Sequence, residues 1–119
     1  MRYFSKIMQF SDSNFSIFQG QDDLLLPSLS IGADGGVCGL TNFSDNIVSI
    51  YRKFREGDIS EAQKIQMKSN AMMRVINSAN FPSGYYYAFY RKFGLNGGYR
   101  APMIEPSEQV KAAINVLNI

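Results

Sequence analysis

The chain has 119 residues, of which 45% are hydrophobic, and its 12 Lys and Arg against 10 Asp and Glu leave a formal net charge of +2. This composition is that of one folded domain, it excludes a disordered chain, and its small charge gives no argument for nucleic acid as a partner. With no histidine, one cysteine and no apolar run long enough for a membrane or a signal peptide, the sequence excludes His-based triads, most zinc sites and internal disulfides, and we expect a cytoplasmic protein.

The first part of the chain predicts a strand, a helix and a second strand in succession. After a helix over residues 2–11, the segments FSIFQ (residues 15–19) and GGVCG (residues 35–39) are typical of short buried strands. The apolar segment 22–31 between them is long enough for one helix. Such a βα unit favours a parallel sheet, and the chemistry of barrels built from these units lies where the strands end.

The rest of the chain is predicted to be helical, with one extended segment over residues 99–105. Helices are expected in four places: from Asn42 or Ser44 to Gly57, from Asp58 to about Ser78, over 85–95, and after the capping residue Ser107. Two strands cannot close a (β/α)₈ barrel, which takes roughly 250 residues. The chain is therefore a small α+β domain or the C-terminal part of something larger.

Four sequence motifs occur in order along the chain. They are GQDDLLLP after the first expected strand, GADGGVCGLTN around the second, EGDISEAQ at the start of the long helix, and GGYRAPM near the end. Together they resemble the dihydrodipicolinate synthase / N-acetylneuraminate lyase superfamily. The pairing of Gly20-Gln21-Asp22 with Gly98-Tyr99-Arg100 looks most like its 2-keto-3-deoxygluconate aldolase branch. Tyr85-Tyr86-Tyr87 stands where the synthase branch often has a lysine.

The resemblance implies a fold, an activity and a set of partners. Members are (β/α)₈ TIM barrels, so residues 1–56 would hold the last two parallel strands and residues 57–119 the C-terminal helices. Members are class I aldolases, in which a lysine at the end of the sixth strand forms a Schiff base with pyruvate or another 2-keto acid, without a cofactor or a metal. That lysine would lie upstream, so this chain would supply no catalytic residue. Its expected partners are the 2-keto acid, the upstream barrel half and further copies of the enzyme.

The resemblance implies that five residues line the substrate pocket, and most of them have a structural alternative. Gly20 lets backbone approach the keto acid, or only makes a tight turn. Asp22 accepts a hydrogen bond from a substrate hydroxyl, or caps a helix. Val37 turns its carbonyl toward pyruvate, or is only a core residue of its strand. Gly39 leaves room for a ligand or for packing. Ser83 resembles a position that faces the barrel mouth.

Two further expectations follow from the apolar residues. Cys38 alternates away from its neighbours and is predicted to be a buried structural thiol. Phe15, Ile17 and Val37 would lack neighbours without the rest of a barrel, so the chain alone should be marginal, oligomeric or prone to aggregate. The alternative function is that of a small non-catalytic interaction protein, which would use the aromatic helix 85–95 to bind a partner.

Overall fold

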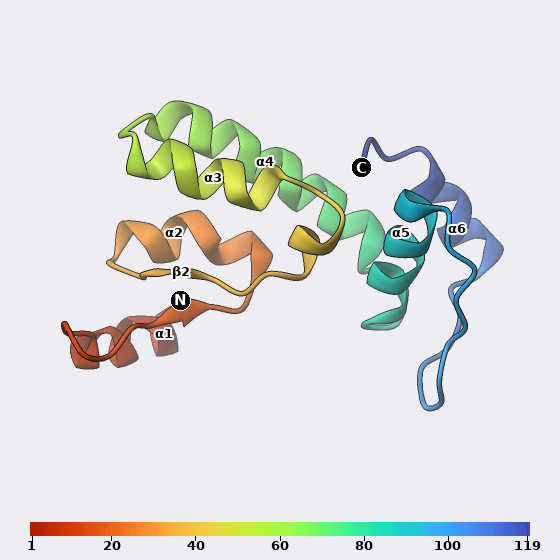
Figure 1. The fold of residues 1–119 in the computed structure, drawn as a ribbon, viewed down its shortest axis with the longest axis horizontal. Coiled ribbons are helices and arrows are strands. Elements are labelled where there is room, and N and C mark those ends of the chain that lie inside the picture. Colours follow the sequence, from red (N-terminus) through yellow and green to blue (C-terminus); the bar gives the residue numbers. More distant parts are fainter. The chain divides into compact units, whose positions relative to one another are not determined.

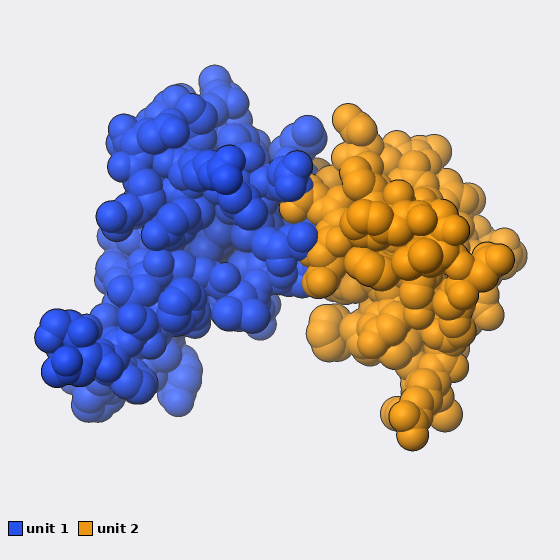
Figure 2. All heavy atoms as spheres, viewed as in Figure 1, with its two compact units in different colours: residues 1–41, 45–70 blue, residues 42–44, 71–119 orange.

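The computed structural model describes all residues, 1–119, and they form two compact units, coloured separately in Figure 2. Unit 1 holds residues 1–41 and 45–70, and unit 2 holds residues 42–44 and 71–119. The elements in chain order (Figure 1), with 3₁₀ helices labelled η, are α1 (Arg2–Ile7), η1 (Met8–Phe10), β1 (Phe18–Gln19), η2 (Asp22–Leu24), α2 (Leu25–Ser30), β2 (Gly35–Gly36), η3 (Gly39–Asn42), α3 (Asn46–Arg55), α4 (Ile59–Ile76), α5 (Ser83–Phe93) and α6 (Glu108–Asn115). No helix is both long enough and apolar enough to cross a membrane.

The two strands of unit 1 are parallel, which confirms the βα unit that the sequence predicted. β1 and β2 pair with Phe18 opposite Gly35 and Gln19 opposite Gly36. Each strand has two residues and is therefore shorter than expected. At the start, Phe15 forms an isolated antiparallel bridge with Asp12, and after β2 the chain turns at once toward η3.

The two expected strands are buried only in part. Ile17 and Gln19 are 6% and 5% exposed, whereas Phe15, Phe18 and Val37 are 58%, 53% and 75% exposed. The prediction of buried strands is thus correct only for part of each segment, because Phe15 and Val37 lie beyond the two residue pairs of the sheet and Phe18 lies on the face opposite Ile17 and Gln19. Phe15 and Val37 are exposed, as expected for side chains without neighbours. Ile17 is buried, contrary to that expectation.

The expected helix 22–31 is interrupted near its start. Residues 22–24 form η2, and α2 follows with Pro27 as its third residue, where a missing N–H removes no bond within the helix. α2 packs against α3 and buries its leucines. The fully or nearly fully buried apolar side chains of unit 1 are Leu25, Leu29, Leu40, Ile47, Ile50 and Ala62.

The helix after the second strand begins later than expected. Neither Asn42 nor Ser44 caps α3, because η3 occupies residues 39–42 and the N-cap is Asp45. Gly57 follows the end of α3, where the sequence predicted that the helix stops. Its φ of +81° is a conformation that glycine adopts without strain.

α4 begins where the sequence predicted. The Asp58 carboxylate accepts a hydrogen bond from the Glu61 N–H at 3.1 Å, which confirms the N-cap. Ala62 and Ile76 are buried, whereas Ile59, the first residue of the helix, is 40% exposed.

Unit 2 is built mainly on α5, which packs against α6. α5 begins and ends two residues earlier than the expected 85–95, and Gly94 ends it with φ of +62°. A Cβ on buried Gly84 would collide with the Ile76 carbonyl oxygen, so this glycine allows α5 to approach the end of α4. Ser107 caps α6 as predicted, by accepting a hydrogen bond from the Val110 N–H.

Candidate functional site

The C-terminal ends of β1 and β2 bring together four of the five predicted site residues. Gly20 directly follows β1 and Val37 directly follows β2, and the Val37 N–H donates a hydrogen bond of 2.8 Å to the Gln19 carbonyl oxygen. Asp22 reaches across to the backbone of Gly39. The parallel pairing thus places the two strand ends side by side, at the edge of the sheet where α/β proteins carry their chemistry.

The carboxylate of Asp22 joins the two strand ends. Its two oxygens accept hydrogen bonds from the N–H groups of Gly39 at 3.2 Å and Leu40 at 2.7 Å. These are the first two residues of η3, so Asp22 caps that element and not its own helix, which has no side-chain cap. Burial raises the pKa of Asp22, against the backbone hydrogen bonds from Leu40, Gly39 and its own N–H, which lower it.

Glutamine side chains hold the loop after β1, and the sequence interpretation missed them. Gln66 of α4 is buried; its side-chain oxygen accepts from the Leu26 N–H and its nitrogen donates to the Asp22 carbonyl oxygen, both at 2.9 Å. Gln19 donates to the Ser28 hydroxyl at 2.6 Å. One feature of the sequence could have indicated that Gln66 is buried. It lies one turn after Ala62, on the apolar face of the helix, where a polar side chain needs a hydrogen-bond partner.

The backbone around the strand ends is open at two of the predicted positions. Gly20 is exposed, and no atom lies within 4 Å of the place where a Cβ would stand. The Val37 side chain is 75% exposed, although valine usually packs when it lies in or beside a strand. Gly39 is half-buried. Gly20 and Val37 are therefore both open to solvent.

Ser83 and Cys38 are both buried. Ser83 belongs to unit 2, where its hydroxyl donates a hydrogen bond to the Asn80 carbonyl oxygen at the start of α5. Cys38 is 5% exposed, which confirms the predicted buried thiol. Burial, with a smaller contribution from the charge of Asp22, raises the pKa of Cys38 to about 12.

No lysine is placed as a Schiff-base nucleophile. All six lysines lie on helices, and none is buried. Lys53, Lys64 and Lys111 pair with glutamates at 2.6–2.9 Å, and these partners raise the pKa of each amine. A nucleophilic amine needs the opposite shift, which burial or a neighbouring cation provides.

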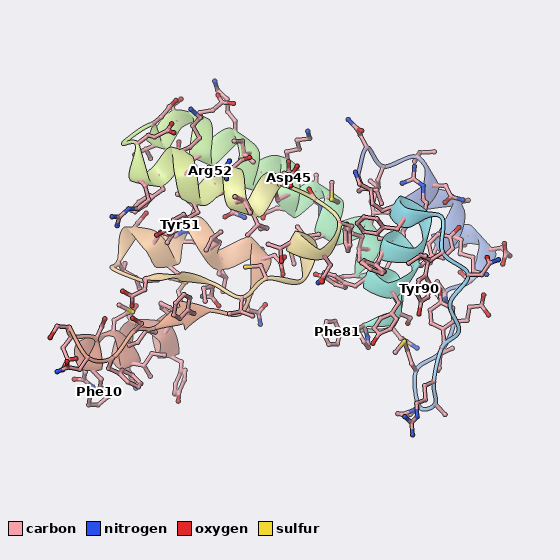
Figure 3. All side chains as sticks on the ribbon, viewed as in Figure 1. Phe10, Asp45, Tyr51, Arg52, Phe81 and Tyr90 are labelled. Atoms are coloured by element: carbon pink, nitrogen blue, oxygen red, sulfur yellow. The ribbon has the colours of Figure 1, made fainter.

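The aromatic residues of unit 2 surround a cavity of about 430 Å³. Its lining residues are Asn42, Phe43, Tyr85, Tyr86, Phe89 and Tyr90. The Tyr86 and Tyr90 rings meet edge to face at 5.9 Å, and the Tyr90 hydroxyl donates to the Gly98 carbonyl oxygen at 3.2 Å. Tyr90, labelled in Figure 3, thereby joins α5 to the extended segment after it. Much of this aromatic surface is accordingly used in packing within unit 2.

The two parallel strands and the crossover through α2 are the features of consecutive βα units of an α/β protein. Residues 1–117 match the dihydrodipicolinate synthetase family, and the chain belongs to this family. The resemblance carried by the four motifs is thus confirmed.

Two relatives show how much of a longer protein the chain matches. It is 54% identical over 116 residues to an uncharacterized DapA-like lyase of Thermoplasma acidophilum, covering 97% of this chain and 40% of that one. It is 43% identical over 106 residues to the 2-dehydro-3-deoxy-D-gluconate/2-dehydro-3-deoxy-phosphogluconate aldolase of Picrophilus torridus, covering 87% and 39%. The chain therefore spans about two-fifths of the length of these relatives.

Solved structures give the same picture. The 2-keto 3-deoxygluconate aldolase from Picrophilus torridus superposes with a TM-score of 0.85 at 45% identity, over 89% of this chain and 39% of that one. The N-acetylneuraminate lyase from Fusobacterium nucleatum, complexed with pyruvate, gives a TM-score of 0.81 over 97% and 39%. At 24% identity this second likeness shows the fold alone.

Proposed function

We propose that this chain forms the last two strand–helix units and the helical extension of a class I aldolase. The intact enzyme would cleave 2-keto-3-deoxy sugar acids to pyruvate and an aldehyde. The observation that carries the proposal is the 45% identity, at a TM-score of 0.85, to the Picrophilus torridus 2-keto 3-deoxygluconate aldolase. The proposal includes a cytoplasmic homo-oligomer completed by the upstream barrel half.

The proposed reaction needs a nucleophile that these residues do not supply. A lysine amine attacks the keto carbon of the substrate, water leaves, and the resulting Schiff base accepts the electrons of the breaking carbon–carbon bond. Covalent catalysis requires that amine within bonding distance of the carbonyl, and the lysines here are exposed or paired with glutamates. The nucleophile would therefore come from a preceding strand of the barrel.

The residues at the strand ends would form walls of the pocket. Gly20 and Val37 would face the pyruvate moiety with their backbone, and Gly39 would leave room beside them. The Asp22 carboxylate keeps acceptor capacity beyond its two backbone hydrogen bonds, and that capacity would receive a substrate hydroxyl.

Reductive trapping tests this assignment. The 119-residue chain and a longer chain that includes the upstream barrel strands are each treated with pyruvate and borohydride at neutral pH, and mass spectrometry measures the adduct. The short chain should stay unmodified and the longer one should gain one adduct on a lysine. The matched control is the longer chain with that lysine replaced by alanine. Stoichiometric labelling of the short chain, or none of the longer one, would contradict the proposal.

A further inference from the structure

Gln66 of α4 binds both ends of one turn of the chain after β1. Its side-chain nitrogen donates to the Asp22 carbonyl oxygen, and its side-chain oxygen accepts from the Leu26 N–H, both at 2.9 Å. The carbonyl and the N–H belong to residues four apart, which is the spacing at which the backbone of an α-helix bonds to itself. A side chain that inserts there interrupts the helix. The turn is accordingly a 3₁₀ helix, η2, and α2 begins only at Leu25.

The Gln66 side chain is buried and held in one orientation. It is 5% exposed, and its nitrogen also donates to the Asn70 side-chain oxygen, one turn further along α4, at 2.9 Å. Both the oxygen and the nitrogen of this amide therefore have partners, which burial requires. A methionine side chain of similar size would fill the same space and bind neither end of the turn. The insertion consequently depends on the amide group and not on the volume of the side chain.

The turn that Gln66 binds begins at Asp22, whose carboxylate oxygens accept from the N–H groups of Gly39 and Leu40. Because the direction of a side chain depends on the backbone conformation, closure of this turn into α-helix would redirect the carboxylate. We propose that Gln66 is a positioning residue, whose inserted amide keeps η2 in its 3₁₀ form and the Asp22 carboxylate at the strand ends. The inference rests on the proposed function only for its effect on turnover, in which Asp22 receives a substrate hydroxyl and Gln66 touches no substrate.

The NMR signal of the Leu40 amide proton tests the positioning in the 119-residue chain. Loss of a charge-assisted hydrogen bond moves such a signal upfield, and Asp22→Ala, which removes the acceptor, gives the full displacement. Gln66→Met should move the signal in the same direction by at least about half of that displacement, because the carboxylate is no longer directed at the N–H.

The matched control is Ser69→Ala. It removes a buried hydroxyl of the same helix, whose hydrogen bond to the Ile65 carbonyl oxygen stays within α4, and it should leave the Leu40 signal in place. Asn70→Ala is a milder second variant, because it frees the Gln66 amide without replacing it. It should move the signal in the same direction by less, which keeps the test decisive if Gln66→Met does not fold.

Turnover shows whether the positioning serves the substrate. In the longer chain that includes the upstream strands, Gln66→Met should lower kcat/KM for a 2-keto-3-deoxy sugar acid at least about tenfold and leave the rate of pyruvate trapping within about twofold, because pyruvate lacks the hydroxyl that Asp22 would bind. Added to Asp22→Ala, the same substitution should cause little further loss, since both act through one carboxylate.

An unmoved Leu40 signal in Gln66→Met, or an equal displacement in Ser69→Ala, overturns the proposal. So does an equal loss of turnover and trapping, or a full further loss on top of Asp22→Ala, because either result would make Gln66 a general support of the fold. If the Leu40 signal moves as expected and the longer wild-type chain neither traps pyruvate nor cleaves the sugar acid, the positioning of Asp22 stands and only the proposed function is contradicted.

Discussion

At the scale of single residues, Asp22 joins two segments that are distant in sequence. Its carboxylate oxygens accept from amides 17 and 18 residues further along the chain. A capping preference is a local rule, and from it we expected Asp22 either to cap its own helix or to bind substrate. The observed partners depend on the parallel pairing of β1 and β2, and no local pattern reveals them.

Replacement of Asp22 by alanine should destabilise unit 1. The N–H groups of Gly39 and Leu40 would lose their acceptor, and Leu40 is fully buried, so we expect a loss of roughly 1.5–3 kcal/mol in the free energy of unfolding. Urea denaturation measures it. The matched control is Asp23→Ala, since Asp23 is the exposed neighbour in the same turn. Equal stability of the two variants would show that the bridge between the strand ends contributes nothing.

The stability of the chain should also depend on pH through Asp22. Burial raises the pKa of this carboxyl in the folded state above 3.8, so between the two pKa values the folded chain binds more protons than the unfolded chain. The stabilisation of the folded state that this proton binding provides is fully present below pH 3.8. It is lost as the pH rises through the folded-state pKa of Asp22. The difference in unfolding free energy between wild type and Asp22→Asn should therefore fall over that window. A difference that rises with pH would mean that the backbone hydrogen bonds outweigh burial.

At the scale of elements, helices were easier to predict than strands. The caps Asp58 and Ser107 are encoded within four residues of the amides that they bind, so the sequence located both helix starts. The strands depend on partners far away. β2 ends at Gly36, and by Gly39 and Leu40 the chain has turned to the Asp22 carboxylate, so Val37, which we expected within the strand, follows its end. The role of Gln66 was not predicted for the same reason, because its hydrogen-bond partners lie 40 and 44 residues away in the sequence.

The approach of α5 to the end of α4 should depend on Gly84. A methyl group there meets the Ile76 carbonyl oxygen, and both residues belong to unit 2, so Gly84→Ala should lower the free energy of unfolding by about 1–3 kcal/mol. Gly20→Ala is the matched control, because its Cβ would stand in open space and should change stability little. Chemical denaturation of both variants decides it. Equal effects would show that α5 can shift without cost.

At the scale of the whole molecule, the open edge of β1 should govern behaviour in solution. Unpaired strand edges beside exposed aromatic side chains favour association. Light scattering of the purified 13.4-kDa chain should therefore give a mass above that of a monomer, rising with concentration, and thermal unfolding should be broad. Phe18→Ser should reduce the association. A monodisperse monomer with a sharp, cooperative transition would identify an independently stable domain and weaken the proposal that it is part of a barrel.

The bond from the Leu26 N–H to Gln66 has a consequence for isotope exchange. Leu26 is the second residue of α2, so its amide has no acceptor within the helix, and a side chain of α4 supplies one instead. Deuterium uptake at this amide consequently reports the separation of α4 from α2, whereas uptake at Leu29, deeper in the helix, reports the unwinding of α2 itself. Two amides three residues apart thereby distinguish loss of packing from loss of secondary structure in unit 1.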